Sequence, residues 1–188
     1  MDAFLTSTLV VALAEIGDKT QLLSLLLAAR YRKPLPIVAG IFVATIANHF
    51  LAAALGAWIR EVAPPDVMRW AVGGSLLAIA LWTLKPDKLD GELRESTRAG
   101  LFVMTCGVFF LAEMGDKTQI ATIVLAAQYQ PLWAVVVGTT LGMMIANVPV
   151  VYMGSMAAHR IPFRAVRMAT ALLFAVLGVA SLMGVGNA

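Results

Sequence analysis

The fold of this chain is decided by two nearly identical octets, Ala14-Glu15-Ile16-Gly17-Asp18-Lys19-Thr20-Gln21 and Ala112-Glu113-Met114-Gly115-Asp116-Lys117-Thr118-Gln119. They differ at one position and are 98 residues apart. Each octet lies inside an otherwise apolar run, and together they hold four of the 11 acidic residues. A carboxylate inside an apolar membrane span costs roughly 2.5 to 3.5 kcal/mol, so such groups usually mark an ion or proton path. The octets are therefore the first candidates for a functional site.

The composition indicates an integral membrane protein. Of the 188 residues 60% are hydrophobic and only 13% are charged, and the mean hydropathy is +0.84. A soluble domain of this size cannot bury so much apolar surface. The net charge of +3 does not indicate a nucleic-acid partner. The single cysteine, Cys106, excludes an intramolecular disulfide and a thiolate metal cluster, and no cleaved signal peptide is expected at the N-terminus.

The apolar runs predict an all-α membrane protein with six transmembrane helices. Each run is long enough for a hydrocarbon core of about 30 Å. The expected spans cover about residues 4–29, 37–59, 66–84, 99–127, 132–157 and 163–184. Residues 85–98 carry eight charges and are expected to form a solvated linker.

The two halves of the chain resemble each other beyond the octets. Gly40 matches Gly138 at an offset of 98, and Asn48 matches Asn147 at an offset of 99. We interpret the chain as a duplicated three-span unit, residues 1–84 and 99–188, joined by the linker 85–98. Three spans are an odd number, so the second copy must enter the membrane from the opposite side, as in many secondary transporters.

The positions of the basic residues predict the orientation. The connections after the first, third and fifth spans carry ten Lys and Arg residues, whereas the other side carries only Arg60 and Arg69. Because basic residues favour the cytoplasmic side, both termini are expected outside the cytoplasm.

The spacing of the octets predicts a metal site. In a continuous helix Glu15 and Asp18 would share one face, and inverted copies could bring two such faces together at mid-membrane. The donors are all oxygen atoms, which hard cations such as Ca²⁺, Mg²⁺ and Mn²⁺ prefer. The expected metal ligands are Glu15, Asp18, Glu113 and Asp116. The expected supporting residues are Lys19, Thr20, Gln21, Lys117, Thr118, Gln119, Asn48 and Asn147.

The charges of the octets suggest exchange of a metal for protons. Four carboxylates and two lysines leave −2, which one divalent cation or two protons would neutralise. Two structural interpretations stay open at this point. Glu15 with Lys19, and Glu113 with Lys117, have the spacing of an ion pair within one helix. The two asparagines could serve only as hydrogen-bonding groups between helices.

Both octets resemble the E-x-G-D-[KR]-[TS] motif of a family of small membrane cation/proton exchangers. That family includes Golgi and chloroplast-envelope manganese and calcium transporters and bacterial manganese exporters, within a wider lysine-exporter-like group. The resemblance covers the whole chain and implies six helices, a site built from both motifs, and export of Mn²⁺ or Ca²⁺ against protons. Because the chain is short, with no presequence and a central loop of 14 residues, it looks like a bacterial plasma-membrane member of that family.

Three other functions compete with this hypothesis. An aspartyl intramembrane protease would need Gly-x-Gly-Asp, but the positions two before Gly17 and Gly115 are glutamates, so no enzyme is expected. A passive divalent-cation channel and an amino-acid exporter are the alternatives. The expected partners are the transported metal ion, protons and the lipid bilayer, with no nucleic acid and no cofactor, and a homodimer is left open.

Overall fold

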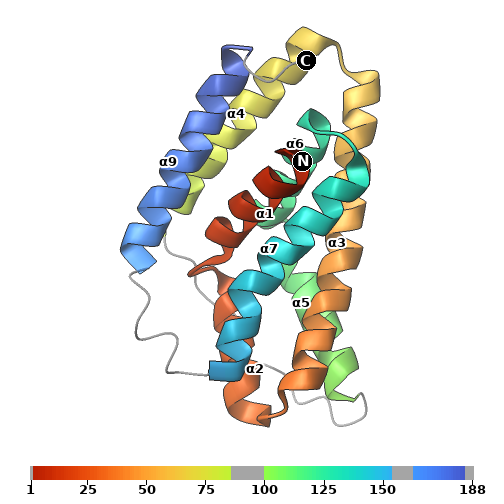
Figure 1. The fold of residues 1–188 in the computed structure, drawn as a ribbon, viewed down its shortest axis with the longest axis vertical. Coiled ribbons are helices and arrows are strands. Elements are labelled where there is room, and N and C mark those ends of the chain that lie inside the picture. Colours follow the sequence, from red (N-terminus) through yellow and green to blue (C-terminus); the bar gives the residue numbers. More distant parts are fainter. Residues whose placement is uncertain (1, 86–99, 154–162, 185–188) are drawn as a thin grey trace.

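The computed structural model describes residues 2–85, 100–153 and 163–184, and the regular structure in these ranges is entirely α-helical (Figure 1). This confirms the predicted all-α class. The helices are α1 (Asp2–Glu15), α2 (Lys19–Tyr31), α3 (Pro34–Val62), α4 (Pro65–Thr83), α5 (Leu101–Glu113), α6 (Lys117–Gln128), α7 (Leu132–Met153) and α9 (Phe163–Leu182).

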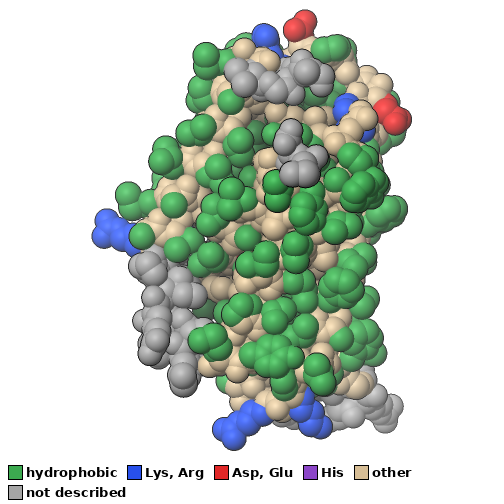
Figure 2. All heavy atoms as spheres, in the orientation of Figure 1, with side chains coloured by type: hydrophobic (Ala, Val, Ile, Leu, Met, Phe, Trp, Pro, Cys, Tyr) green, Lys and Arg blue, Asp and Glu red, His purple; other side chains and the backbone are tan. Residues whose placement is uncertain are grey.

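Within the described residues, three helices are long and apolar enough to cross a membrane: α3, α7 and residues Arg164–Leu182 of α9. They coincide with the second, fifth and sixth expected spans. The third expected span corresponds to α4, which is 19 residues long. Hydrophobic side chains cover most of the face shown in Figure 2, while charged side chains lie near its two ends and at one edge. An apolar surface of this kind is that of a membrane protein.

Some expected features fall outside the described residues. These are most of the linker 85–98, the first residue of the fourth expected span, the last four residues of the fifth, and Arg160 among the basic residues. The sixth expected span ends two residues beyond α9.

The prediction that residues 4–29 and 99–127 each form one continuous helix is wrong. Each span is divided at its octet, into α1 and α2 in the first half and α5 and α6 in the second. Gly17 has a φ of 83° and Gly115 a φ of 74°. This left-handed conformation is open to glycine and strained for other residues, and it ends the helical hydrogen-bond ladder. The octets are therefore junctions between half-length helices.

Helices from one half of the chain lie against helices from the other half. The broken pair α1 and α2 follows α7, and the pair α5 and α6 follows α3. A Cβ added to Gly138 would lie 2.6 Å from the carbonyl oxygen of Phe4, and one added to Gly40 would lie 2.9 Å from that of Phe102. The two contacts are equivalent, because Gly40 and Gly138 are 98 residues apart in the sequence and so are Phe4 and Phe102. Small residues at these positions allow the close backbone approach that is common between membrane helices.

The third helices of the two halves, α4 and α9, pack side by side (Figure 1). They run in opposite directions, and Gly73 meets Gly178 at their contact. A Cβ on Gly73 would lie 3.0 Å from the carbonyl oxygen of Gly178, and one on Gly178 would lie 3.1 Å from that of Gly73.

Two hydrophobic clusters form the core of the described residues. One contains residues of α1, α4, α6 and α9 with the beginning of α7 and Ala53 of α3, and the other contains residues of α2 and α5 with the beginning of α3 and Val151 of α7. The two halves of each broken helix thus belong to different clusters. The octets lie where one cluster gives way to the other, with apolar packing on both sides.

The positive φ at the helix breaks gives a test of the fold. A Cβ added to Gly115 would meet no atom within 4 Å, so Gly115→Ala changes little except the backbone preference. We expect this variant to lose about 1–2 kcal/mol of unfolding free energy, because L-residues disfavour left-handed backbone. Gly107→Ala is the matched control: it also meets no atom within 4 Å but lies within helix α5, where alanine is favoured over glycine by about 0.5–1 kcal/mol. In equilibrium unfolding in detergent, the unfolding free energy should therefore fall for Gly115→Ala and rise for Gly107→Ala. Equal changes in the two variants would contradict a glycine-dependent break.

Candidate cation site

The two aspartates of the octets begin the second half of each broken helix. Asp18 is the N-cap of α2, and its Oδ2 accepts a hydrogen bond from the Thr20 amide at 3.3 Å. Asp116 is the N-cap of α6, and its Oδ1 accepts from the Lys117 amide at 2.6 Å. Aspartate is favoured here because its side chain satisfies an unpaired N–H and its charge faces the positive end of the helix dipole. The glutamate and aspartate of one octet therefore lie on different helices, and the predicted shared helix face is wrong.

The glutamines of the octets stabilise the breaks. The Oε1 atom of Gln21 accepts a hydrogen bond from the Gly17 amide at 2.9 Å, and that of Gln119 accepts from the Gly115 amide at 2.7 Å. Each bond satisfies an amide that the break leaves without a helical partner. The side-chain amides then donate to the opposite half, Gln21 to the Ala146 carbonyl at 3.1 Å and Gln119 to Oδ1 of Asn48. The two glutamines thereby connect each break to the other half of the chain.

The two glutamates are buried and only partly hydrogen-bonded. Glu15 is 0% exposed and accepts a hydrogen bond on Oε2 from Thr20 at 2.5 Å. Glu113 is 1% exposed and accepts on Oε1 from Thr45 at 2.9 Å. Within the described part of the chain, the other oxygen of each glutamate is buried without a hydrogen-bond partner. A buried carboxylate oxygen left unpaired is costly, so each calls for a proton or a cation.

The two lysines form ion pairs between the octets. The Nζ atom of Lys117 lies 2.6 Å from Oδ1 of Asp18, and that of Lys19 lies 3.3 Å from Oδ2 of Asp116. These pairs join the two halves of the chain. They therefore differ from the ion pairs within one octet, Glu15 with Lys19 and Glu113 with Lys117, that the spacing had left open. Each lysine therefore lies against the aspartate of the opposite half.

The structure brings the four predicted ligands into one buried region. Glu15 is close enough to Asp18, Asp116 and Glu113 for like-charge repulsion between the carboxylates. All four side chains are at most 1% exposed. They do not form a closed ligand set, because no three His, Cys, Asp or Glu side chains among the described residues are arranged to hold one metal ion. The lysine ammonium groups contact the aspartates instead.

The predicted supporting asparagines lie beside the octets and bond between helices. Asn48 on α3 accepts from Gln119 and donates to the Phe110 carbonyl at 3.3 Å. Asn147 on α7 accepts on Oδ1 from the Ser24 hydroxyl at 2.6 Å. Both links connect the halves, as the hydrogen-bonding interpretation expected. The predicted Thr118 is also buried here, and its hydroxyl has no hydrogen-bond partner among the described residues.

Two polar residues of this region were missed by the sequence analysis. Thr45 supports Glu113, and Ser24 supports Asn147. Ser24 lies three residues beyond Gln21, so the same helical spacing that drew attention to the glutamine could have found it. No comparable signal marks Thr45, because its counterpart in the second half, Met143 or Met144, carries no hydroxyl.

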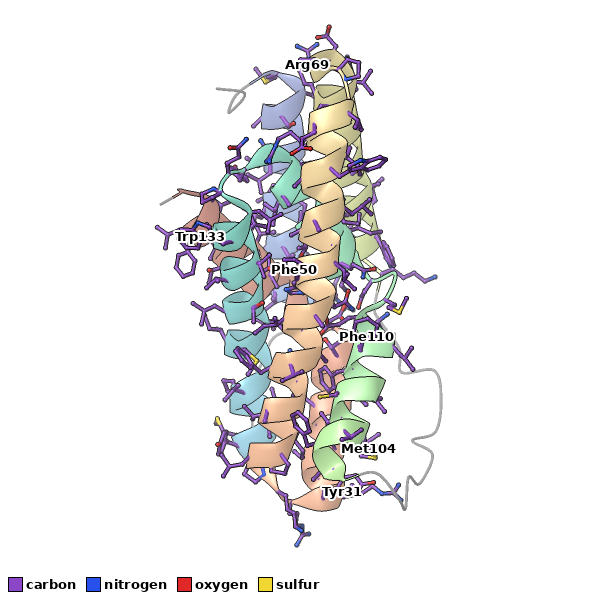
Figure 3. All side chains as sticks on the ribbon, turned by 90° about the vertical axis from the view of Figure 1, so that its right-hand side faces the viewer. Tyr31, Phe50, Arg69, Met104, Phe110 and Trp133 are labelled. Atoms are coloured by element: carbon purple, nitrogen blue, oxygen red, sulfur yellow. The ribbon has the colours of Figure 1, made fainter. Side chains whose placement is uncertain are left out.

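The region lies near the middle of the molecule along its long axis. In Figure 3 Phe50 on α3 and Phe110 on α5 are labelled near mid-height, while Arg69 and Tyr31 are labelled at opposite ends. Phe110 is one helical turn before the end of α5, where the second octet begins. The polar groups are therefore separated from both ends of the helices.

Comparison with known proteins agrees with this geometry. A family model described as "Divalent cation/proton antiporter GDT1" matches residues 3–91 and 101–187. A Vibrio cholerae protein named "Putative manganese exporter" is 56% identical over 182 residues, which cover 96% of this chain and 90% of that protein. A GDT1-like protein of Synechocystis is 30% identical over 96% of this chain and 97% of that protein. GDT1-like protein 5 of Arabidopsis thaliana is 27% identical over 97% of this chain and 96% of that protein.

No solved structure matches the chain. The family model covers nearly the whole described chain and both octets, and relatives align over almost their full length. The buried carboxylates of the octets occur in the setting that a cation transporter requires. The chain belongs to the GDT1 family of divalent cation/proton antiporters, which are membrane transporters of cations.

Proposed function

We propose that this protein exports a divalent cation from the cytoplasm in exchange for protons, with Mn²⁺ preferred to Ca²⁺. The observation that carries the proposal is a buried set of four carboxylates drawn from both halves of the chain. Within this set, one oxygen each of Glu15 and Glu113 has no hydrogen-bond partner among the described residues. A divalent cation or two protons can satisfy both oxygens, and this makes the two species alternatives at one site.

The donor chemistry favours a hard cation as substrate. Carboxylate, hydroxyl and carboxamide oxygens surround the site, and these are the ligands of Mn²⁺, Ca²⁺ and Mg²⁺. We assign the metal-ligand role to Glu15, Asp18, Glu113 and Asp116. A zwitterionic amino acid would need a matched cationic partner for its carboxylate and is less well suited to four acidic groups.

The net charge of the site favours exchange over passive flow. Four carboxylates and the two lysines give −2, so the unloaded site is costly to carry through a low-dielectric barrier. Loading with one Mn²⁺ or with two protons brings the charge to zero. A channel would not require this balance at each step. The manganese preference rests on the 56% identical relative, whose name specifies manganese.

We infer that the chain is a pair of inverted three-helix repeats with six membrane spans, residues 1–84 and 99–188, joined by residues 85–98. Support comes from contacts that recur at an offset of 98, such as Gly40 with Phe102 and Gly138 with Phe4. The antiparallel contact between α4 and α9, with reciprocal approach of Gly73 and Gly178, has the form expected across a two-fold axis. Broken helices at the centre are typical of such transporters.

We also propose that the protein lies in the bacterial inner membrane with both termini outside the cytoplasm. The end of α2 and the connection to α3 carry Arg30, Arg32 and Lys33, all exposed, and we take this to be the cytoplasmic end. The opposite end carries acidic residues beside its basic ones, including Glu61 and Asp66. Basic connections favour the cytoplasmic side of a bacterial membrane.

The carboxylate assignment predicts that each half is essential for transport. Glu15→Gln and Glu113→Gln keep shape but remove one charge, so the site can no longer be neutralised by one divalent cation. We expect either change to lower Mn²⁺ transport into proteoliposomes at least tenfold, measured with an internal metal-sensitive dye. Glu61→Gln, an exposed change outside the site, is the control and should transport normally. Normal transport by either site variant would refute the assignment.

The exchange mechanism predicts coupled fluxes. A Mn²⁺ gradient is imposed across proteoliposomes that contain a pH dye, with the membrane potential clamped by valinomycin and potassium. Metal entry should drive protons out, because the two species alternate on the same carboxylates, and Glu113→Gln should abolish both fluxes. The same gradient of Ca²⁺ should drive slower proton efflux than Mn²⁺ does. Metal flux without proton movement under the clamp would favour a channel.

The proposed orientation predicts which residues can be labelled from each side. In a background with Cys106→Ala, Asp66→Cys should react with a membrane-impermeant maleimide in intact spheroplasts. Arg32→Cys should react only in inside-out vesicles, because its turn faces the cytoplasm. The reverse pattern would invert the proposed topology.

A further inference from the structure

We infer that Lys19 and Lys117 are internal competitors of the transported cation. Each ammonium group contacts an aspartate oxygen that the cation would also bind, so cation binding must displace the lysines. This inference rests on the proposed function and adds to it a built-in mechanism that keeps cation affinity low enough for release.

The crossed geometry is the first observation. Lys117 follows Asp116 in the chain but pairs with Asp18, and Lys19 follows Asp18 but pairs with Asp116. The distances are 2.6 and 3.3 Å. Each lysine therefore reaches across the interface between the halves to the aspartate that its own octet does not supply.

The positions of the lysines on their helices are the second observation. Lys19 and Lys117 are the first residues of α2 and α6. The positive end of the helix dipole makes this an unfavourable place for a cation. The helix alone would not favour a lysine there, whereas a buried aspartate of the opposite octet would. The arrangement occurs in both halves.

The chemistry of the ammonium group makes displacement necessary. Lysine offers only N–H donors, so it cannot ligate a metal, and it needs the anionic oxygens for itself. A divalent cation on the same aspartates would meet a positive charge a few ångströms away, in surroundings with little water to screen it. Lysine and metal are therefore alternatives on Asp18 and Asp116.

The crossed pairs also hold the two octets together. While both lysines are paired, α2 is linked to the beginning of α6 at mid-membrane. A cation that displaces them replaces two separate links with one shared centre. The two pairs are not equivalent, because the side chain of Lys19 is 29% exposed and that of Lys117 only 3%. Lys19 should give way at smaller cost, and Lys117 should be the stronger competitor.

The test is Mn²⁺ binding to the purified full-length protein in detergent at fixed pH, with free Mn²⁺ followed by electron paramagnetic resonance. Lys117→Met should lower the Kd at least tenfold, and Lys19→Met should lower it severalfold. Lys33→Met, an exposed lysine in the turn between α2 and α3, is the matched control and should leave the Kd unchanged. In proteoliposomes both site variants should show a lower KM together with a lower kcat, because tighter binding slows release.

A role in shaping the site would give the opposite result. If the lysines only position the aspartates, their removal should weaken Mn²⁺ binding or leave it unchanged, and either result in both variants would overturn this inference. Lys117→Met leaves Asp18 buried without this partner, and the loss of one member of a buried ion pair is destabilising. If this variant is less stable than the wild type, added Mn²⁺ should raise its melting temperature by more than it raises that of the wild type. If Lys117→Met does not fold even with Mn²⁺, the Kd of Lys19→Met decides the question.

The same titration separates this inference from the function beneath it. If the wild-type protein binds Mn²⁺ and Glu15→Gln binds it with a higher Kd, the carboxylate site is supported, whatever the result for the lysine variants. Unchanged affinity in the lysine variants would then refute only the competition. Wild-type protein that binds no divalent cation would overturn the proposed function and this inference together.

Discussion

The structure depends on the need to neutralise four carboxylates that are buried at the centre of an apolar helix assembly. Asp18 and Asp116 are each paired with a lysine of the opposite half, and Glu15 and Glu113 each receive one threonine hydroxyl. Because each aspartate is balanced by a lysine of the other half, the two halves face each other at the octets. The crossed pairs therefore fix how the two halves meet, and the apolar clusters pack on either side of them.

The helix breaks serve this same constraint. A continuous helix would satisfy its own backbone and leave only side chains for an ion, whereas a break presents peptide dipoles and unpaired amides at mid-depth. In this protein the glutamines take up the freed glycine amides and the aspartates cap the following helices. Irregular backbone is tolerated within a membrane when protein groups satisfy it in this way. The amide of each glycine thereby keeps a hydrogen bond.

The symmetry of the centre is incomplete. Glu15 is supported by Thr20 of its own octet, but Glu113 is supported by Thr45 of the opposite half. The octets align at an offset of 98 and the asparagines at 99, so a one-residue slip separates the two alignments. The two carboxylate pairs therefore have different surroundings and different exposure of their lysines. A transporter that presents its site to two sides in turn has no need of identical halves.

The sequence by itself determined the helical membrane class, the positions of α3, α4, α7 and α9 to within a few residues, and most of the polar residues at the centre, though not Thr45 or Ser24. Long apolar runs and repeated octets carry this information because burial of charge in a membrane is so costly. Only the tertiary structure decided that the octets are breaks, since Glu and Asp three apart are compatible with an unbroken helix and glycine permits either conformation. It also decided the partners of the lysines and the role of Thr45, because these contacts join residues 68 to 99 positions apart that no local pattern relates.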